Sequence, residues 1–508
     1  MRRKLGIIIA GLVVSAFAAG AIVVSRRSAD QVHSRIVQSL SRGLDSEVTL
    51  EGVEVGVLPR PYIKGRGLVI RHLGRSDVPP LIVVREFTTH TSWSRLFDKD
   101  VDEVHLDGLE VTIPPGRRKD MPQMGGRSVE PSRVIIRRLL AHDARLTVMP
   151  KNAKKNPRVF DLFDLTMSDL AFDRQAAFKA TLTNPIPFGT IETQGTFGPW
   201  AATEPRETPL SGAFTFSADL STIKGIAGSL ASTGRYTGTI ERVVTSGDTQ
   251  TPDFRIPTLN AVAMPLSTSY DALVDGANGD VELTRVDVRL GASKLQATGN
   301  IVGTKGVKGK RVLLRLKSQD ARMEDVLSLT VRRQPPAMTG QVQLDASFDL
   351  PQGDRDVVEK IRLDGRVSVK TARFTVDRIQ DKVDELSRRG RGRPTDQSIS
   401  DVASDFSTAF RVEGGMVTLT GLTYNVSGAS VALAGTYALE SGALDFNGDA
   451  RLVASASATQ TGVKRVLLMP FDFLFRKDGA GTLVGINVTG TVDHPRVGVD
   501  LLRRKKGK

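Results

Sequence analysis

Residues 342–350 read Val-Gln-Leu-Asp-Ala-Ser-Phe-Asp-Leu, with an apolar side chain at every second position and a polar one between. Successive side chains of a β-strand point to opposite faces, so this alternation predicts a strand with one buried face and one solvated face. Segments of this kind recur from about Val48 to Leu502, at the roughly 10–15-residue spacing of a meandering antiparallel sheet. The sequence therefore predicts a mainly β protein.

Glycine occupies a fixed place in several of these segments. In residues 431–439, Val-Ala-Leu-Ala-Gly-Thr-Tyr-Ala-Leu, Gly435 falls in phase with the apolar side chains. Gly299, Gly365, Gly448 and Gly490 do the same in their own segments. A glycine inside a strand costs stability because it packs nothing, so its repetition indicates a shared need. Either the strands bend so that the sheet coils into a trough, or the apolar face needs space for a close neighbour.

We expect an elongated, strongly curved antiparallel β-sheet whose concave apolar face forms a groove. The side chains expected to line this groove for a lipid are Leu344, Phe348, Leu433, Tyr437, Phe446 and Val488. The same five glycines would bend it. An ordinary curved sheet, filled by its own side chains, would give the same pattern, and the sequence leaves both interpretations open.

The N-terminus carries an export signal. Met1 to Lys4 contains three basic residues, the run from Leu5 to Ser25 is uncharged, and Arg26 and Arg27 follow. About 20 apolar residues suffice for a membrane-spanning helix, and the basic start favours a cytoplasmic N-terminus. The alternative is a cleaved signal peptide, with residues 16–18 (Ala-Phe-Ala) as the cleavage site. Under either interpretation the rest of the chain is exported.

The chain divides by composition into six parts. These are a cytoplasmic tip and transmembrane helix at 1–27, a connecting helix at 28–45, β regions at 46–205, 206–350 and 351–502, and a basic tail at 503–508. Helical spacing predicts one short helix over residues 375–389, ended by Gly390, and another over 398–410. A third helical candidate covers residues 463–475.

Composition narrows the function. The 508 residues contain no cysteine, which excludes disulfides, thiolate metal ligands and cysteine nucleophiles. The net charge of +14 is dispersed over loops, outside any nucleic-acid-binding module, so we expect no nucleic-acid partner. Basic loops on an anchored protein suit an anionic membrane surface. Solvated loop charge is the simpler explanation.

No catalytic or metal-binding pattern stands out. The six histidines are scattered singly, and the sequence lacks nucleophile-elbow, phosphate-loop and zinc-protease motifs. Residues 275–280 (Asp-Gly-Ala-Asn-Gly-Asp) resemble a calcium loop superficially, but they are better explained as a tight turn. We expect no catalytic residue, no metal and no cofactor, and we predict that the chain is not an enzyme.

Several short segments, in their order along the chain, resemble the AsmA-like family of envelope proteins (AsmA and TamB type). Residues 48–61 (VTLEGVEVGVLPRP) and 101–113 (VDEVHLDGLEVTI) resemble its N-terminal region. Its C-terminal region resembles residues 385–394, 410–419, 428–435, 479–482 and 486–490. This resemblance implies a repeating β-groove, anchored in the bacterial inner membrane and projecting into the periplasm. It also implies shielding of phospholipid acyl chains during outer-membrane biogenesis, and it offers no catalytic residues.

Two functions therefore compete. The first is binding or transfer of membrane phospholipid through the groove. The second is non-enzymatic assembly of outer-membrane proteins through contacts with other envelope proteins, for example by strand addition at an open sheet edge. Lipid that co-purifies with the protein would favour the first.

Overall fold

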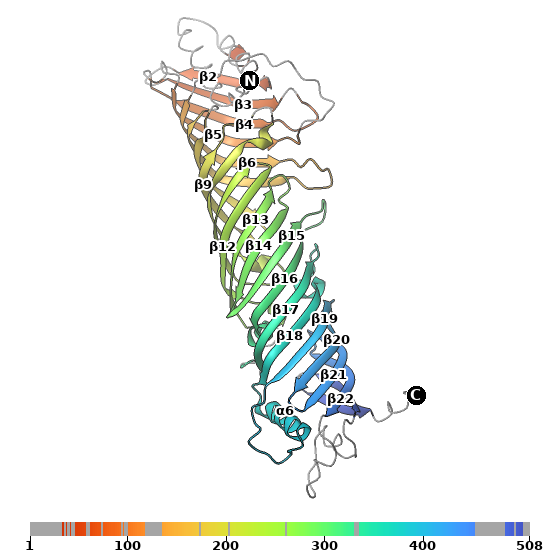
Figure 1. Ribbon diagram of the computed structural model, residues 1–508. Coiled ribbons are helices and arrows are strands. Elements are labelled where there is room, and N and C mark those ends of the chain that lie inside the picture. The colour runs from red at the N-terminus through yellow and green to blue at the C-terminus, as the bar shows by residue number, and fades with distance from the viewer. Residues whose placement is uncertain are drawn as a thin grey trace, which may run out of the picture.

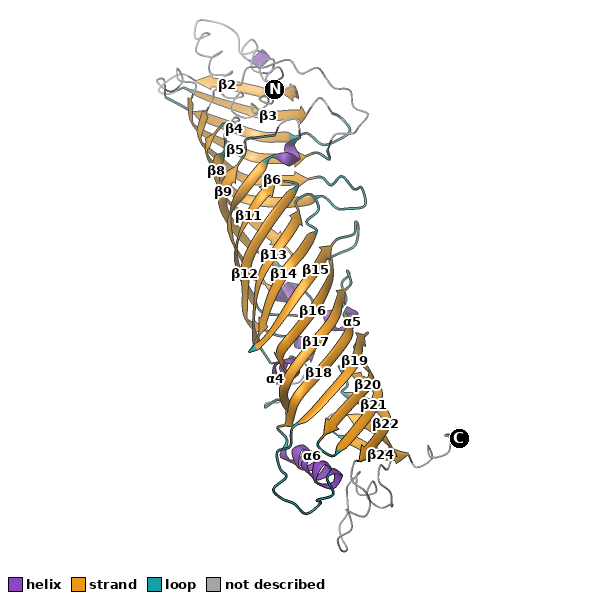
Figure 2. Cartoon of the chain, in the orientation of Figure 1, coloured by secondary structure: helices purple, strands orange, loops and turns teal. Residues whose placement is uncertain are grey.

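The computed structural model describes most of the chain. The described residues are 33–34, 37, 41, 46–56, 61–72, 75–92, 95, 100–116, 135–171, 174–201, 204–259, 262–329, 335–452, 483–491 and 494–500. They form one long, strongly curved sheet of 24 strands with a few short helices at its margins (Figures 1 and 2). The prediction of a mainly β, strongly curved sheet is confirmed.

The strands follow one another along the chain. The first half contains β1 (Ser46–Thr49), β2 (Gly52–Gly56), β3 (Tyr62–His72), β4 (Ile82–His90), β5 (Asp100–Ile113), β6 (Ile135–Val148), β7 (Arg158–Leu170), β8 (Ala176–Pro185), β9 (Phe188–Phe197), β10 (Pro209–Asp219), β11 (Ser229–Thr239) and β12 (Arg242–Phe254). The second half contains β13 (Met264–Asp275), β14 (Val281–Leu290), β15 (Ser293–Val302), β16 (Arg311–Arg322), β17 (Met338–Leu350), β18 (Arg362–Phe374), β19 (Ser404–Glu413), β20 (Met416–Val426), β21 (Ala429–Ala438), β22 (Ala443–Leu452), β23 (Leu483–Thr491) and β24 (Pro495–Asp500).

The strands pair in sequence order and run antiparallel to their neighbours, with two exceptions. β1 and β2 share one row, because both pair with β3, at its end and its start respectively. β5 and β6 are parallel, whereas all other described pairs are antiparallel. The expectation of a wholly antiparallel sheet is therefore wrong at this one pair. A parallel neighbour requires the chain to cross back over the length of the strand before the next strand begins.

A line of irregular positions crosses the sheet near its N-terminal end. The pairing passes over one residue in each of five adjacent strands: Gly67, Arg85, Gly108, Asp143 and Phe163. Three of these residues, Gly67, Gly108 and Asp143, have positive φ angles of 63°, 62° and 53°. The register itself shifts at one of the five positions, Phe163, between β7 and β8, and a bulge of this kind bends its strand and increases the local twist.

The strand ends form two long margins. Edge A carries the turns that follow residues 148, 185, 219 and 254, and edge B carries those that follow residues 197, 239, 275, 302 and 350. The sheet coils so far that the two edges meet. The Arg158 backbone N–H on edge A donates to the Ala277 carbonyl on edge B, at 2.9 Å. Further along, the Val357 N–H on edge B donates to the Lys224 carbonyl on edge A, at 3.1 Å.

The helices lie at these margins. α4 (Met323–Ser328) and α6 (Asp377–Gly390) lie on edge A, and α5 (Val357–Lys360) lies on edge B (Figure 2). There are also three short 3-10 turns, η1 (Pro205–Glu207), η2 (Leu220–Thr222) and η3 (Pro257–Leu259). α6 confirms the helix predicted over 375–389. It packs Val383 and Leu386 against Val426, Ala429 and Tyr424.

The helix predicted over residues 398–410 is wrong, because residues 404–413 form strand β19. Phe406, Phe410 and Val412 alternate with polar residues there and pair with β18 and β20. In the predicted connecting helix, the four described residues (33, 34, 37 and 41) are helical. The membrane segment at 1–27 and the candidate helix at 463–475 lie outside the described residues. No helix within the described ranges has the length and apolar character needed to span a bilayer.

The packed core sits at the N-terminal end. It is built from β1 to β8 and includes Ile63, Ile70, Val101, Ile136 and Leu139, each at most 1% exposed. Two small clusters lie beneath α4 and α6. Among the described residues of β9 to β15 and their connections, Ala277 is the one buried residue that belongs to any of these three clusters. Among the described residues, the middle of the trough therefore lacks the packed core that fills its N-terminal end.

Candidate functional site

Two rows of apolar side chains run the length of the concave face. The first row takes one residue from every strand between β2 and β23, the second one from every strand between β3 and β23, and each residue is directly paired with the next across the sheet. The first row is Val53, Gly65, Phe87, Leu106, Ala141, Leu165, Ala180, Thr193, Phe214, Gly234, Gly247, Tyr270, Val286, Ala297, Leu316, Ala346, Gly365, Phe410, Leu419, Gly435, Phe446 and Val488.

The second row lies two residues along each strand from the first, or three in β14, where the register shifts. It comprises Ile63, Thr89, Val104, Leu139, Met167, Phe178, Gly195, Gly212, Tyr236, Thr245, Ala272, Leu283, Gly299, Leu314, Phe348, Leu363, Val412, Val417, Tyr437, Leu444 and Gly490. We call the two rows together the apolar strip. The strip contains no charged residue, and at about 4.8 Å per strand it extends roughly 100 Å along the sheet.

The groove residues expected from the sequence all fall on this face. Phe446 and Val488 belong to the first row, and Phe348 and Tyr437 to the second. Leu344 and Leu433 face the same side, two residues from a row member in their strands. Phe446 is buried and the other five are half-buried. Half-burial is what an apolar side chain shows when its own sheet surrounds it and no second layer covers it.

The five glycines also face the trough, and each lies against a neighbouring backbone. A Cβ at Gly299, Gly365, Gly435, Gly448 or Gly490 would lie within 2.5 Å of the carbonyl oxygen of a residue in the next strand or turn. No side chain fits in that space. The sequence could not distinguish a bent strand from a close neighbour; the structure shows the close neighbour, which is the backbone of the adjacent strand or turn.

Aromatic rings cover further glycines of the strip. A Cβ at Gly212 would meet the Tyr236 ring, one at Gly234 the Phe214 ring, and one at Gly65 the Phe87 ring. A ring that lies over a cross-strand glycine restores the buried apolar area that the glycine lacks. The strip therefore stays apolar where its own residue has no side chain.

Exposure changes along the strip. From β1 to β6 the concave side chains are mostly buried in the packed core. On β10, β12 and β20 the burial alternates between half-buried on the concave face and exposed on the convex face. A continuous, half-exposed apolar surface of this size marks a binding surface more often than a chance exposure.

An apolar cavity of about 360 Å³ lies where the filled part gives way to the uncovered part. Strands β4 to β12 and their connections contribute its walls, with Leu165, Phe178, Ala180 and Val243 among the lining side chains. Its size is within the range of small-molecule pockets, and its lining is almost entirely apolar. The chemistry it can offer is burial of hydrocarbon.

Two of the polar groups in the wall of this cavity bear on what it could bind. The Tyr236 hydroxyl lies 2.7 Å from the Thr193 hydroxyl, and burial raises the pKa of Tyr236, so the phenol stays neutral. The indole Nε1 of Trp200 is buried and finds no hydrogen-bond partner among the described residues. A buried donor without a partner costs free energy that a ligand oxygen could recover.

Above the cavity the two edges of the sheet are joined. We call this contact clasp 1: residues 149–158 of edge A against residues 206, 241, 275–280 and 303–310 of edge B. The Lys155 Nζ binds Asp280 Oδ2 at 2.5 Å and the Gly303 carbonyl at 2.8 Å. The Lys305 backbone N–H donates to the Lys154 carbonyl at 3.0 Å. The fully buried Arg206 donates to the Met149 carbonyl at 2.7 Å.

A second contact between the edges, clasp 2, lies further along the trough. The Lys224 carbonyl and Thr258 belong to edge A, and Asp356 and Val357 to edge B. Thr258 Oγ1 donates to Asp356 Oδ2 at 2.8 Å, beside the Val357–Lys224 backbone bond. A Cβ at Gly225 would lie 2.5 Å from Asp356 Oδ1, so a glycine is needed for this approach. The two clasps therefore join the edges of the trough at two places along its length.

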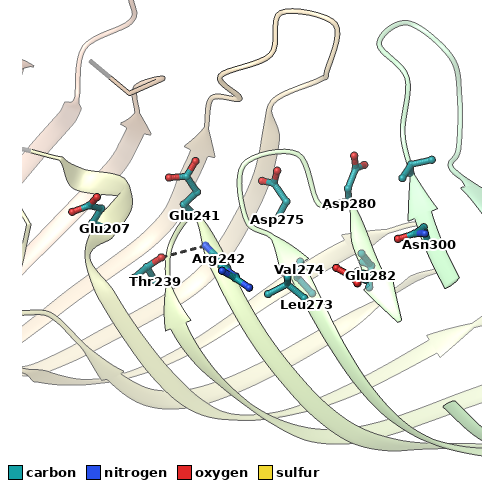
Figure 3. A pocket seen from close by; sticks show the side chains of 12 residues that line it. Glu207, Thr239, Glu241, Arg242, Leu273, Val274, Asp275, Asp280, Glu282 and Asn300 are labelled. Carbon is teal, nitrogen blue, oxygen red and sulfur yellow. Dashed lines mark hydrogen bonds between the residues drawn. The ribbon is translucent and has the colours of Figure 1, made fainter. Parts of the chain in front are cut away.

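Many of the charged side chains lie on the convex face and in the turns. Arg315–Asp345 at 2.5 Å and Arg411–Asp364 at 2.8 Å are cross-strand ion pairs on the face opposite the apolar strip. A polar hollow of about 730 Å³ lies on this outer side near edge B (Figure 3). Figure 3 shows its carboxylates, among them Glu241, Asp275 and Asp280, around Arg242. Of these, Glu241 and Asp280 are already paired with clasp lysines.

The remaining expectations concern enzymes and metals. Residues 275–280 form the turn between β13 and β14, in which Asp275 accepts from the Ala277 N–H at 2.8 Å, as predicted for a tight turn. The described residues contain no group of side chains suited to hold a metal ion. His90 and His105, distant in sequence, come within 6.2 Å of each other between ring centroids, and His105 bonds to Glu103. No nucleophile lies beside them in these contacts.

Comparison with known proteins finds no matching family model, no matching curated protein and no matching solved structure. The site must therefore be interpreted from its own geometry. Sequence reasoning had identified the concave face but neither clasp, because both join loops separated by about a hundred residues. The basic clusters at 151–155 and 305–311 were the available signal for clasp 1, and they could not be paired from sequence.

Proposed function

We propose that this protein binds the acyl chains of membrane lipid along its concave face. The observation that carries the proposal is the apolar strip, which is uncharged from β2 to β23 and half-exposed over its middle and C-terminal strands. Binding an aliphatic chain would remove this surface from water at about 25 cal/mol for each Å² of apolar area buried. A water-soluble small molecule with several polar groups would find few partners there.

The length of the strip favours transfer of lipid along the sheet over storage of lipid in one place. One acyl chain needs only a small part of a surface about 100 Å long. A strip without charged residues lets a chain shift from one strand to the next with little change in free energy. The proposed activity is therefore transfer of phospholipid along the sheet, with no chemical reaction.

The proposal includes the location of the protein in the cell. The uncharged run at 5–25 would anchor the chain in the inner membrane, with the sheet in the periplasm, as in AsmA-like proteins. Its support is the sequence signal together with a groove of the type that this resemblance implies. Retention of the full chain in carbonate-washed membranes, with the sheet accessible to protease only from the periplasmic side, is the expected result. Release of the protein by the wash would contradict anchoring.

Leu433 and Ala434 provide a matched test of lipid binding. They are neighbours on β21, but Leu433 faces the trough and Ala434 is exposed on the convex face. Leu433→Glu places a carboxylate beside the apolar strip, and Ala434→Glu adds the same charge outside it. Full-length protein of each kind is purified, and its bound lipid is extracted and quantified by mass spectrometry.

We expect bound phospholipid in the wild type and in Ala434→Glu, and several-fold less bound phospholipid in Leu433→Glu. The circular dichroism spectra of the three proteins should be the same. Burying an unpaired carboxylate against hydrocarbon is costly, and this accounts for the loss. A wild-type protein that carries no lipid and accepts none from labelled vesicles would refute the proposal.

The open end of the sheet supports a second candidate. Among the described residues β24 has one partner strand, β23, so its other side is free to pair with an incoming strand. An assembly factor for outer-membrane proteins could use this edge. The chain contains no cysteine, so a single cysteine in place of the exposed Arg496 can carry a photo-crosslinker. Crosslinks to unfolded outer-membrane protein, in a preparation without lipid, would favour this candidate over lipid transfer.

A further inference from the structure

Arg158 is a cation beside the apolar cavity, without a carboxylate partner among the described residues. Its guanidinium carbon lies 5.1 Å from the centre of the Phe160 ring, and Phe160 lines the cavity. The side chain is half-buried, and its one described hydrogen bond goes to the neutral Asn184 Oδ1, at 3.2 Å. No carboxylate among the described residues pairs with it. A guanidinium has five N–H donors, so most of its bonding capacity is unused.

Two lysines converge on the same turn. A Cβ at Gly279 would lie 3.1 Å from Lys310 Nζ and 3.4 Å from Arg158 Cδ. Lys155 reaches Asp280, the next residue, from the other side of clasp 1. Both lysine side chains are about one-quarter exposed, so solvent and solutes can reach them. Three cations from edge A and edge B therefore meet beside a hydrocarbon cavity.

The nearby carboxylates are committed to holding the clasp. Asp280 Oδ2 accepts from Lys155, and its Oδ1 accepts from the Gly303 backbone N–H at 2.8 Å. Asp275 accepts from the Ala277 N–H and the Asn278 side-chain amide, both at 2.8 Å. Their charge offsets that of the two lysines. Arg158 remains as the cation whose partner is missing, and a half-buried cation without an anion is unfavourable.

We propose that Arg158, supported by Lys155 and Lys310, binds the phosphate of an anionic lipid headgroup whose acyl chain enters the apolar cavity past Phe160. This inference rests on the proposed lipid-binding function and adds to it the class of headgroup. A guanidinium fork matches two phosphate oxygens, and its stacking on Phe160 fixes the orientation of the fork. The phosphate would complete the bonding of Arg158, and the chain would fill the cavity beneath.

The geometry favours a lipid phosphate over free phosphate. Phe160 is at once the ring beneath Arg158 and part of the cavity wall, so one molecule can use both. Free phosphate would gain only the charged contacts, in a place where two carboxylates oppose it.

The test uses three probes on the full-length chain: 1-oleoyl lysophosphatidate, 1-oleoylglycerol and inorganic phosphate. The first two share one acyl chain and differ by the phosphate. Binding is measured by competition with a fluorescent fatty acid, and for inorganic phosphate by calorimetry. The variants are Arg158→Gln, Arg158→Lys, which keeps the charge but not the fork, and Lys154→Gln. Lys154 is an exposed lysine of the same loop and serves as the charge-matched control.

We expect wild-type protein to bind lysophosphatidate at least tenfold more tightly than oleoylglycerol. Arg158→Gln should remove most of that difference while leaving oleoylglycerol affinity unchanged, because a hydrogen bond to a charged group carries roughly a tenfold effect. Arg158→Lys should restore it in part, and Lys154→Gln should behave as wild type.

Equal affinity for the two oleoyl probes in the wild type would overturn the headgroup site and leave the proposed function standing. An equal loss of affinity for both oleoyl probes in Arg158→Gln would also overturn the headgroup site, because it would show that the arginine has only a structural role. Tight binding of inorganic phosphate by itself would assign the site to free phosphate instead. Failure of both oleoyl probes to bind the wild type would refute this inference together with lipid binding.

Discussion

Gly435 offers the sharpest test of how this sheet is built. A methyl group at this position would lie 2.0 Å from the Asp445 carbonyl oxygen and 2.6 Å from the Phe446 Cα. Real Cβ atoms essentially never come closer than about 3.0 Å to such atoms. Gly435→Ala therefore requires β21 and β22 to move apart by about 1 Å. The strand pairing that curves this part of the trough cannot absorb that shift without strain.

The magnitude follows from two contributions. Forcing one extra carbon into a filled space costs about 1–3 kcal/mol. Stretching the adjacent ladder hydrogen bonds adds about 1 kcal/mol, the net value of one such bond. We expect Gly435→Ala to destabilise this part of the sheet by about 2–4 kcal/mol.

Gly52 is the matched control. It is also a strand glycine, but no atom lies within 4 Å of the position that an alanine methyl group would take there, and its backbone is not left-handed. At such a site alanine lowers the entropy of the unfolded chain, so Gly52→Ala should be neutral or stabilising by about 0.4–1 kcal/mol. The two substitutions add the same methyl group, and only the space that receives it differs.

Hydrogen exchange of peptides from β21 and β22 is the appropriate assay, because a sheet of this length opens locally as well as globally. Since 1.4 kcal/mol is a factor of ten, the expected loss accelerates exchange roughly 30- to 1,000-fold in those strands for Gly435→Ala. Gly52→Ala should leave exchange in β2 and β3 unchanged or slower. Unchanged exchange in Gly435→Ala would refute the claim that close backbone approach dictates glycine on the concave face.

Three further outcomes are expected. Ala180→Phe should fill part of the apolar cavity and lower bound lipid by mass spectrometry, whereas Ala177→Phe, on the exposed side of the same strand, should not; equal lipid in both would place binding elsewhere. Trp200→Phe should cost only the packing of the lost ring, about 1–2 kcal/mol in urea denaturation, because the indole N–H it removes has no partner among the described residues; a larger loss would reveal one. Burial lowers the pKa of Lys310 from 10.5 to about 8, so the unfolded chain binds more protons between these values and stability rises with pH across pH 8–10.5. That rise should be absent in Lys310→Met, and equal pH profiles for the two proteins would contradict it.

Much of the site could be predicted from single strands. The alternation in residues 342–350 fixes which side chains of β17 share a face, and it placed Leu344 and Phe348 correctly on the trough side. The same rule applied to Leu433, Tyr437, Phe446 and Val488. Period-2 geometry is a property of each strand alone, so it needs no knowledge of the neighbours. The helix wrongly expected over 398–410 shows the limit, because Phe406 and Phe410 satisfy helical and strand spacing at once.

The sequence by itself determined that this protein is a β-sheet with one uncharged face, interrupted by glycines at defined positions. Only the tertiary structure decided that this face is continuous, since the pairing of each strand with the next sets which apolar residues meet. It also decided the parallel β5–β6 pair, the two clasps and the place of Arg158 beside Phe160. These features depend on the coil that accumulates over many strands, and that coil brings loops together whose local sequences carry no record of each other.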